Sequence, residues 1–173
     1  AAHWAGFEAM RPDGWAPDWP EPNAPATRVS WYGAAACCRW LTSRGLTPVP
    51  GEIGLPTDAQ WRTAYVGASG SEREYPWQGE PDRDRHAHFR RFFGTESQYQ
   101  RTSAVGVYPG GASRSGALDM AGNVWEWCAE KYDDGTLGAT EPDTSGDLRL
   151  LRGGSWFNYN PVFLRASDRL RFD

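Results

Sequence analysis

Residues 117–128 read Ala-Leu-Asp-Met-Ala-Gly-Asn-Val-Trp-Glu-Trp-Cys. Its last six positions, 123–128, show the alternation that is typical of a β-strand. The alternation separates two faces, with Trp125 and Trp127 on one, and Val124, Glu126 and Cys128 on the other. We therefore predict a short strand here.

Two more short strands are predicted on either side of this one. The run Ser-Ala-Val-Gly-Val-Tyr-Pro at residues 103–109 precedes it, and Leu148 to Leu151 follows it, directly before the pair Gly153-Gly154. From Phe157 to Asp173 large aromatic residues mix with Asn, Asp and Arg, and we predict neither a helix nor a strand in this tail.

Upstream, the pattern predicts two helices, over residues 31–44 and 58–66. Ser30 is an N-cap residue, apolar residues follow at spacings of three and four, and Gly45 is a helix stop. Thr57 and Gln60 form the capping-box pattern at the start of the second helix.

Length and composition limit the class of protein. The 173 residues fit one compact domain, and 20 glycines with 13 prolines predict long irregular loops, including residues 1–29. The net charge is −4 and Lys131 is the only lysine, so we expect no nucleic-acid partner. A mean hydropathy of −0.68 and the lack of a long apolar run predict no membrane span. The compartment is left undetermined.

The cysteines and histidines offer few metal or disulfide patterns. Cys37, Cys38 and Cys128 cannot form a disulfide framework, and no zinc spacing occurs. Cys37 and Cys38 are adjacent and could form a strained ring, although small buried residues on a helix are the simpler interpretation. His86 and His88 lie two residues apart; they are either a metal pair or solvated side chains of a charged segment.

Five motifs in one order resemble the formylglycine-generating enzyme family. They are VSWYGAAACCRWL, LPTDAQW, YPW, ALDMAGNVWEWC and LRGGSWF. The resemblance implies an α+β, C-type lectin-like fold, with two helices, small twisted antiparallel sheets and long ordered loops. It also implies one domain over residues 1–173 that lacks family segments at both ends.

The resemblance implies different activities for different branches of this family. Formylglycine-generating enzymes carry a copper-binding cysteine pair shortly after the GGS motif, and residues 156–173 contain no cysteine, so we expect no copper and no enzyme of that kind. Sulfoxide synthases use a three-histidine iron site, for which only His3, His86 and His88 are available.

A third branch, the variable proteins of diversity-generating retroelements, resembles the C-terminal part best. In these proteins LRGGSW is followed by Asn-rich positions and a Leu-Arg-Ala-Ala-Asn-Arg-type string, which residues 164–169 follow. Positions derived from template adenines vary between copies. Every residue from Phe157 to Asp173 can be encoded by a codon that ends in C with free first and second bases, as mutated AAC codons would be.

Residues 157–173 are therefore predicted to form a variable ligand-binding segment. Aromatic rings supply contact area, while Asn and Ser adapt hydrogen bonds to a partner. The candidate ligand-binding residues are Phe157, Asn158, Tyr159, Asn160, Val162, Phe163, Ser167, Asp168, Leu170, Phe172 and Asp173. The alternative is a C-terminal core segment.

Other residues, which precede the candidates or lie between them in the sequence, are predicted to be scaffold. Gly153-Gly154 permits tight turns, Trp156 anchors the loop, and Arg165 and Arg169 tie loop carbonyls or carboxylates. The alternative for the two arginines is a role as anion ligands.

Family members also hold calcium at the DMAGNVWEW motif, and the resemblance implies the same for this chain. The ligands would be the side chains of Asp119 and Glu126 and the carbonyls of Gly122 and Val124. The alternative is an Asp in a turn and a Glu paired with an arginine. A second family calcium site needs an Asn where His88 stands, so we do not expect it.

The functional hypothesis is a non-catalytic ligand-binding domain with a protein as its ligand. A sugar ligand stays open, although Glu21-Pro22-Asn23, Glu80-Pro81-Asp82 and Glu141-Pro142-Asp143 only mimic lectin specificity motifs. The alternative is a metal- and oxygen-dependent oxidoreductase related to formylglycine-generating enzyme or sulfoxide synthase.

Overall fold

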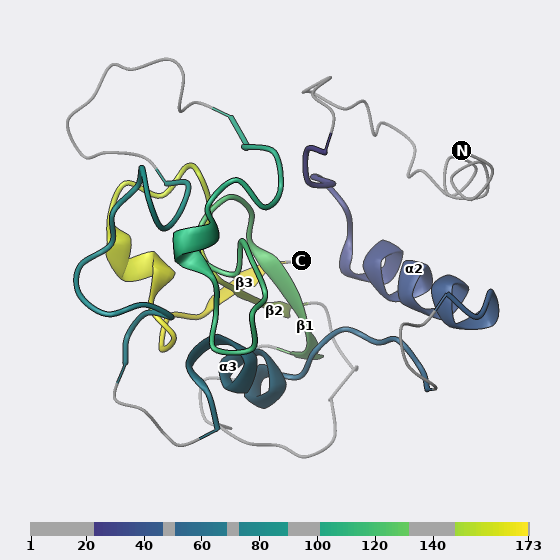
Figure 1. Cartoon of the computed structure of the whole chain (residues 1–173). Coiled ribbons are helices and arrows are strands. Elements are labelled where there is room, and N and C mark those ends of the chain that lie inside the picture. Colours follow the sequence, from purple (N-terminus) through teal and green to yellow (C-terminus); the bar gives the residue numbers. More distant parts are fainter. Residues whose placement is uncertain (1–22, 47–50, 69–72, 90–100, 132–147, 173) are drawn as a thin grey trace.

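The computed structural model describes residues 23–46, 51–68, 73–89, 101–131 and 148–172. Along these residues the helices and strands are α2 (Trp31–Ser43), α3 (Asp58–Val66), η2 (Pro109–Gly111), β1 (Glu126–Lys131), β2 (Arg149–Arg152), η3 (Pro161–Leu164) and β3 (Leu170–Phe172) (Figure 1). Long loops join these short elements. No helix in the described part of the chain is long and apolar enough to cross a membrane.

Both predicted helices are confirmed with their caps. Ser30 Oγ accepts a hydrogen bond from the Gly33 amide at the start of α2. Thr57 and Gln60 form the predicted capping box at the start of α3. Gly45, just after α2, has the positive φ of 63° that a stop residue needs.

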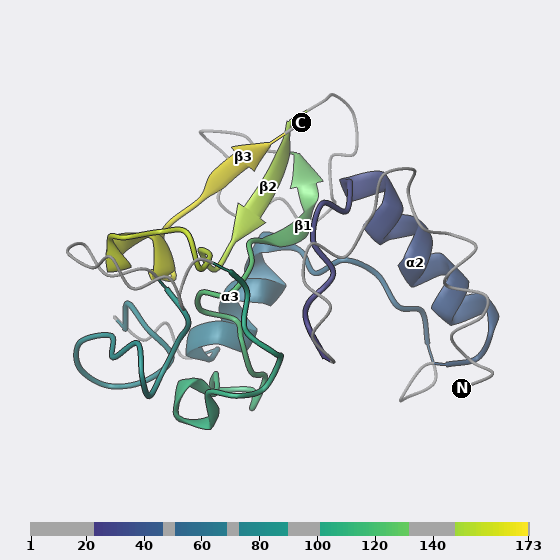
Figure 2. The same cartoon turned by 90° about the horizontal axis from the view of Figure 1, so that it is seen from above.

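The three strands form one antiparallel sheet in the order β1-β2-β3. In both views α2 lies on the β1 side of this sheet, and η3 lies on the other side of the molecule (Figures 1 and 2). Glu126 pairs with Arg152 across β1 and β2, and both side chains contact residues of α3. The other face carries Trp127 and Phe172, whose ring centroids are 6.4 Å apart.

The main core lies where α3 meets the sheet and the surrounding loops. Trp61 and Tyr65 stack with their centroids 4.5 Å apart, and Leu150, Leu164 and Cys128 are fully buried around them. In contrast, α2 has no buried residue, so the expectation that Cys37 and Cys38 are buried is wrong; both are half-buried. The start of this helix is joined to β1 by an indole hydrogen bond from Trp31 Nε1 to the Cys128 carbonyl at 2.8 Å.

The strand predicted over residues 103–109 is wrong. The segment is a loop that ends in η2, and its amides are bonded to groups outside any sheet. The Ser103 amide donates to Asn123 Oδ1 and the Gly106 amide to Asp119 Oδ2, at 3.0 and 2.6 Å. Since Gly106 also has a φ of 78°, the extended conformation is interrupted at its centre.

The other two predicted strands are confirmed with shifted bounds. β1 begins at Glu126 rather than at residue 123, because Gly122 and Asn123 have φ values of 79° and 59°. The predicted alternation holds within it, with Glu126 facing α3 and Trp127 facing Val29. β2 covers residues 149–152 instead of 148–151.

The expectation of a tail without helix or strand is also wrong. Asn160 caps η3 with Pro161 in its first turn. β3 pairs with β2, with Phe172 opposite Arg149 and Leu170 opposite Leu151. A strand of three residues forms only beside the edge of another strand, here β2, and the local sequence does not show which strand will lie there.

Candidate ligand-binding face

The candidate ligand-binding residues lie outside the core. Among those that the structure describes, six are exposed: Phe157, Tyr159, Asn160, Ser167, Leu170 and Phe172. Four are half-buried: Asn158, Val162, Phe163 and Asp168. Asp173 lies outside the described residues. The buried residues of this segment are Leu164 and Ala166, which are 0% and 2% exposed and were not among the candidates.

The segment is held to the rest of the protein through its main chain. The Tyr65 hydroxyl donates to the Leu164 carbonyl, and the Tyr75 hydroxyl donates to the Pro161 carbonyl at 3.3 Å. The Ala166 amide donates to the Glu74 carbonyl at 2.7 Å. These contacts use no side chain of a candidate residue.

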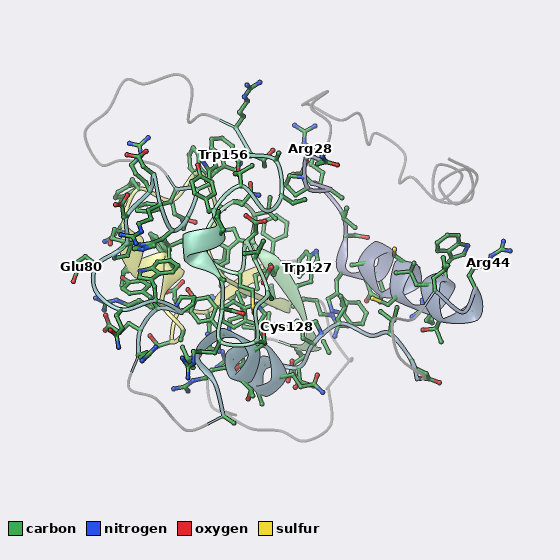
Figure 3. All side chains as sticks on the ribbon, in the orientation of Figure 1. Arg28, Arg44, Glu80, Trp127, Cys128 and Trp156 are labelled. Carbon is green, nitrogen blue, oxygen red and sulfur yellow. The ribbon has the colours of Figure 1, made fainter. Side chains whose placement is uncertain are left out.

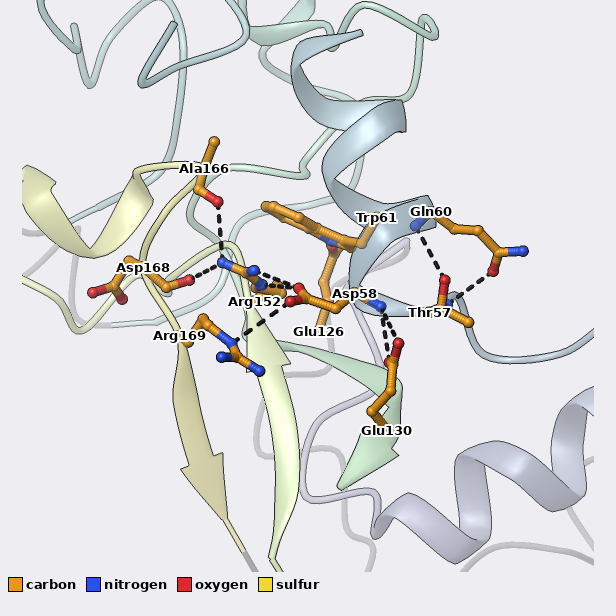
Figure 4. Close-up of polar contacts among 10 residues, drawn as sticks. All are labelled: Thr57, Asp58, Gln60, Trp61, Glu126, Glu130, Arg152, Ala166, Asp168 and Arg169. Atoms are coloured by element: carbon orange, nitrogen blue, oxygen red, sulfur yellow. Dashed lines mark hydrogen bonds and ion pairs between the residues drawn. The ribbon is translucent and has the colours of Figure 1, made fainter. Parts of the chain in front are cut away.

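Arg152 makes a further attachment, and Figure 4 shows its contacts. It is 1% exposed, and its Nη1 donates to the carbonyls of Ala166 and Asp168 at 3.0 and 2.5 Å. Its Nε donates to Asp58 Oδ1 at 2.6 Å, and Nη2 also contacts this oxygen. One buried guanidinium therefore joins the first turn of α3 to the main chain on both sides of Ser167.

The predicted scaffold role of the other two arginines is confirmed for their contacts with carboxylates. Arg169 Nε lies 3.6 Å from Asp58 Oδ2, and Arg165 Nε lies 3.2 Å from Glu74 Oε2. Both arginines thus pair with carboxylates of the protein itself, as expected for residues that hold the segment in place.

Two asparagines among the candidates shape the local backbone. Asn158 Oδ1 accepts from the amide and hydroxyl of Ser155, at 2.7 and 3.0 Å. Asn160 Oδ1 accepts from the Val162 amide at 3.0 Å. These two side chains form a turn and a cap, a role that the sequence alone did not suggest for them.

The loop of residues 103–107 lies beside the start of the segment, and sequence reasoning did not include it in the site. Asn123 connects the two: its side chain binds the amide and carbonyl of Ser103, and its carbonyl accepts from the Trp156 amide at 2.9 Å. Trp156 itself is half-buried and lies on the same side of the molecule as Arg28, away from Arg44 (Figure 3). Val105 and Val107, for which the sequence predicts a strand, are exposed residues of this loop.

The predicted calcium ligands lie around the bend that precedes β1. Glu126 Oε2 accepts from Trp61 Nε1 at 2.5 Å, and burial raises the pKa of this carboxyl to about 7, with the charge of Asp119 acting in the same direction. Asp119 has a φ of 60° and also binds the Gly106 amide. Carboxylate and main-chain carbonyl oxygens, the donor types of these four residues, are the hard ligands that calcium prefers.

The histidines are structural in the described part of the chain. His88 is 5% exposed, so the expectation that it is solvated is wrong; its Nε2 lies 2.6 Å from the Arg101 carbonyl and its Nδ1 lies 3.3 Å from the Tyr108 hydroxyl. His86 is half-buried and stacks on Trp77. No group of three or more His, Cys, Asp or Glu side chains suited to a metal occurs among the described residues.

The family model described as the sulfatase-modifying factor enzyme 1-like domain matches residues 4–173. The chain is 35% identical over 163 residues to hercynine oxygenase of Mycobacterium tuberculosis, an alignment that covers 85% of this chain and 33% of that protein. It is 33% identical over 152 residues to the formylglycine-generating enzyme of Thermomonospora curvata, covering 78% and 45%. The chain thus spans a third to under a half of these two relatives.

The fold is similar to that of a solved structure. Treponema denticola variable protein 1 superimposes with a TM-score of 0.67 at 23% identity, over 91% of this chain and 69% of that one. The α+β, C-type lectin-like fold that the sequence motifs implied is therefore confirmed. Because the family model covers nearly all of its length, the chain belongs to the family of sulfatase-modifying factor enzyme 1-like domains.

Proposed function

We propose that this domain binds a protein ligand without catalysis, through the candidate side chains within residues 157–172. One observation carries the proposal: the segment is attached by main-chain contacts and by Leu164 and Ala166, while the candidate side chains lie outside the core. Apart from Asn160, whose side chain caps η3, the exposed positions tolerate many side chains, because the attachments do not depend on them. The likeness to a solved variable protein supports the same interpretation.

Replacing four exposed apolar side chains together should leave the fold intact. We expect Phe157→Ser, Tyr159→Ser, Leu170→Thr and Phe172→Thr to change the free energy of unfolding by no more than about 2 kcal/mol in total, since single surface changes are within about 0.5 kcal/mol. Urea unfolding measures this change.

The matched control for this variant is Leu164→Ala in the same segment, which should cost about 2–5 kcal/mol because Leu164 is fully buried. If the fourfold variant is the less stable of the two, the segment belongs to the core and the proposal fails.

The coding DNA tests the diversified character of the segment. We expect near-copies of the stretch for residues 157–173 that differ only where the template has adenine. Copies that differ at random positions would contradict this part of the proposal.

We further propose that Asp119 and Glu126, with the carbonyls of Gly122 and Val124, hold a structural calcium ion. Calcium would place a positive charge beside the Glu126 carboxylate, which also accepts a hydrogen bond from the neutral Trp61 indole. Its binding would fix the bend before β1.

Calcium should stabilise the domain. Free calcium at a hundred times its dissociation constant adds about 2.7 kcal/mol, so chelation should lower Tm by several degrees. Glu126→Gln keeps an oxygen for Trp61 Nε1 but removes the charge, and it should abolish the response to calcium. An equal response in this variant, or none in the unmodified protein, would rule out the site.

The second candidate function is that of an oxidoreductase module, which the identity with hercynine oxygenase and formylglycine-generating enzyme favours. The described residues do not fit copper or iron ligation: residues 153–172 contain no cysteine, and both ring nitrogens of His88 contact protein groups. Stoichiometric, tight binding of Cu(I) or Fe(II) by the isolated chain would favour the enzyme over the binding domain.

A further inference from the structure

A second exposed apolar surface lies beside the candidate segment. It consists of Val105, Val107 and Leu118, which are 51%, 51% and 40% exposed, and we call it the constant patch. Val105 and Val107 flank Gly106 in the sequence, and Leu118 lies close to this glycine, because a Cβ built on it would lie 3.6 Å from Leu118 Cδ1. Large apolar side chains that gather on a surface mark interaction sites more often than isolated ones do.

The backbone of the constant patch is fixed at several points. The Val105 amide donates to the Asn23 carbonyl at 2.9 Å, and the Gly106 amide donates to Asp119 Oδ2 at 2.6 Å. Just upstream, Asn123 holds both main-chain polar groups of Ser103. The valines are therefore presented by a loop whose main chain is bonded at Ser103, Val105 and Gly106.

The same asparagine places this loop beside the candidate segment. Asn123 is 1% exposed and has a φ of 59°, and its carbonyl accepts from the Trp156 amide, directly before Phe157. Neither residues 102–108 nor residues 153–164 contain a charged side chain, in a protein of which 23% is charged. The loop and the start of the segment thus form neighbouring, uncharged surfaces.

We propose that the constant patch is an invariable part of the binding face, and that it contacts an uncharged, apolar area of the protein ligand. This inference rests on the proposed function. In it, the same patch contacts every ligand, whichever side chains the segment carries. Centres of protein interfaces are poor in charged residues, which matches this surface. The segment of residues 157–172 would then decide which ligand binds, and the patch would add affinity.

Three displayed libraries of this chain test the inference, with hen egg-white lysozyme as the protein probe. All three randomise the exposed positions of Phe157, Tyr159, Ser167, Leu170 and Phe172. The first keeps the patch, the second carries V105S, V107S and L118S, and the third carries Y32S and L46S. Tyr32 in α2 and Leu46 just after it are 64% and 41% exposed, so the third library loses exposed apolar surface outside the constant patch.

We expect binders from the first and third libraries, and few from the second. Placing V105S, V107S and L118S in a selected binder should weaken its Kd about tenfold or more, while Y32S and L46S should leave it within about twofold. Amide exchange at residues 104–107 should slow in the complex of the unsubstituted binder, which tests the contact even if the patch variant does not fold.

Two results would overturn the inference, and they can be told apart. If patch-altered binders keep their affinity and residues 104–107 show no protection, the patch is outside the face although the segment binds. If no library yields a binder while its members unfold cooperatively, the proposed function itself fails, and the inference fails with it.

Discussion

Replacing Arg152 by methionine should lower the free energy of unfolding by about 3–5 kcal/mol, the range for breaking a buried ion pair by removing one partner. The guanidinium is 1% exposed and satisfies Asp58 and the carbonyls of Ala166 and Asp168. Methionine fills much of the volume but donates no hydrogen bond, so three acceptors lose a partner in a buried site. Urea unfolding at neutral pH measures the loss.

The control is Arg165→Met, which removes the same kind of side chain from the same region. Its ion pair with Glu74 is at the surface, with side chains 39% and 52% exposed, and such pairs contribute about 0–1 kcal/mol. Adding Asp58→Asn to Arg152→Met should recover part of the loss, because the buried carboxylate is then uncharged. Equal losses for the two single variants would contradict the role of Arg152 as the main attachment.

Gly153→Ala should be the second severe change, at about 2–5 kcal/mol. Gly153 has a φ of 90°, where an L-residue is strained by about 1–2 kcal/mol. An alanine Cβ would also lie 2.6 Å from the Met120 carbonyl oxygen, and forcing extra atoms into a packed site costs about 1–3 kcal/mol. Thermal unfolding and amide exchange of residues 153–159 measure both the stability and the local disturbance.

Gly116→Ala separates these two causes. Gly116 has a φ of 86°, yet a Cβ there meets no atom within 4 Å, so only the backbone strain remains. We expect the difference between the two variants to be about 1–3 kcal/mol. If Gly153→Ala lowers the stability no more than Gly116→Ala does, the close approach of the Met120 carbonyl is not the reason why position 153 needs glycine.

Local signals in the sequence determined the two helices, whereas the candidate segment was predicted from a resemblance together with its residue types. Caps at Ser30 and Thr57 act within three residues of themselves, so their effect can be read without knowledge of the fold. The mixture of aromatic and small polar residues after Trp156 marked the side chains that the structure leaves outside the core. The roles of those side chains in binding stay a proposal.

The tertiary structure alone decided which backbone groups are paired, because their partners lie far away along the chain. The run of residues 103–109 has strand-like composition, but Asn123 and Asp119 bind its amides and keep it a loop. Leu170–Phe172 has no strand pattern and becomes β3 because the edge of β2 is open to it. Likewise, the sequence marks Arg152 only as a charged residue. The fold buries it against Asp58, where its N–H groups need acceptors. One acceptor is the Ala166 carbonyl, so Arg152 holds the candidate segment by its main chain.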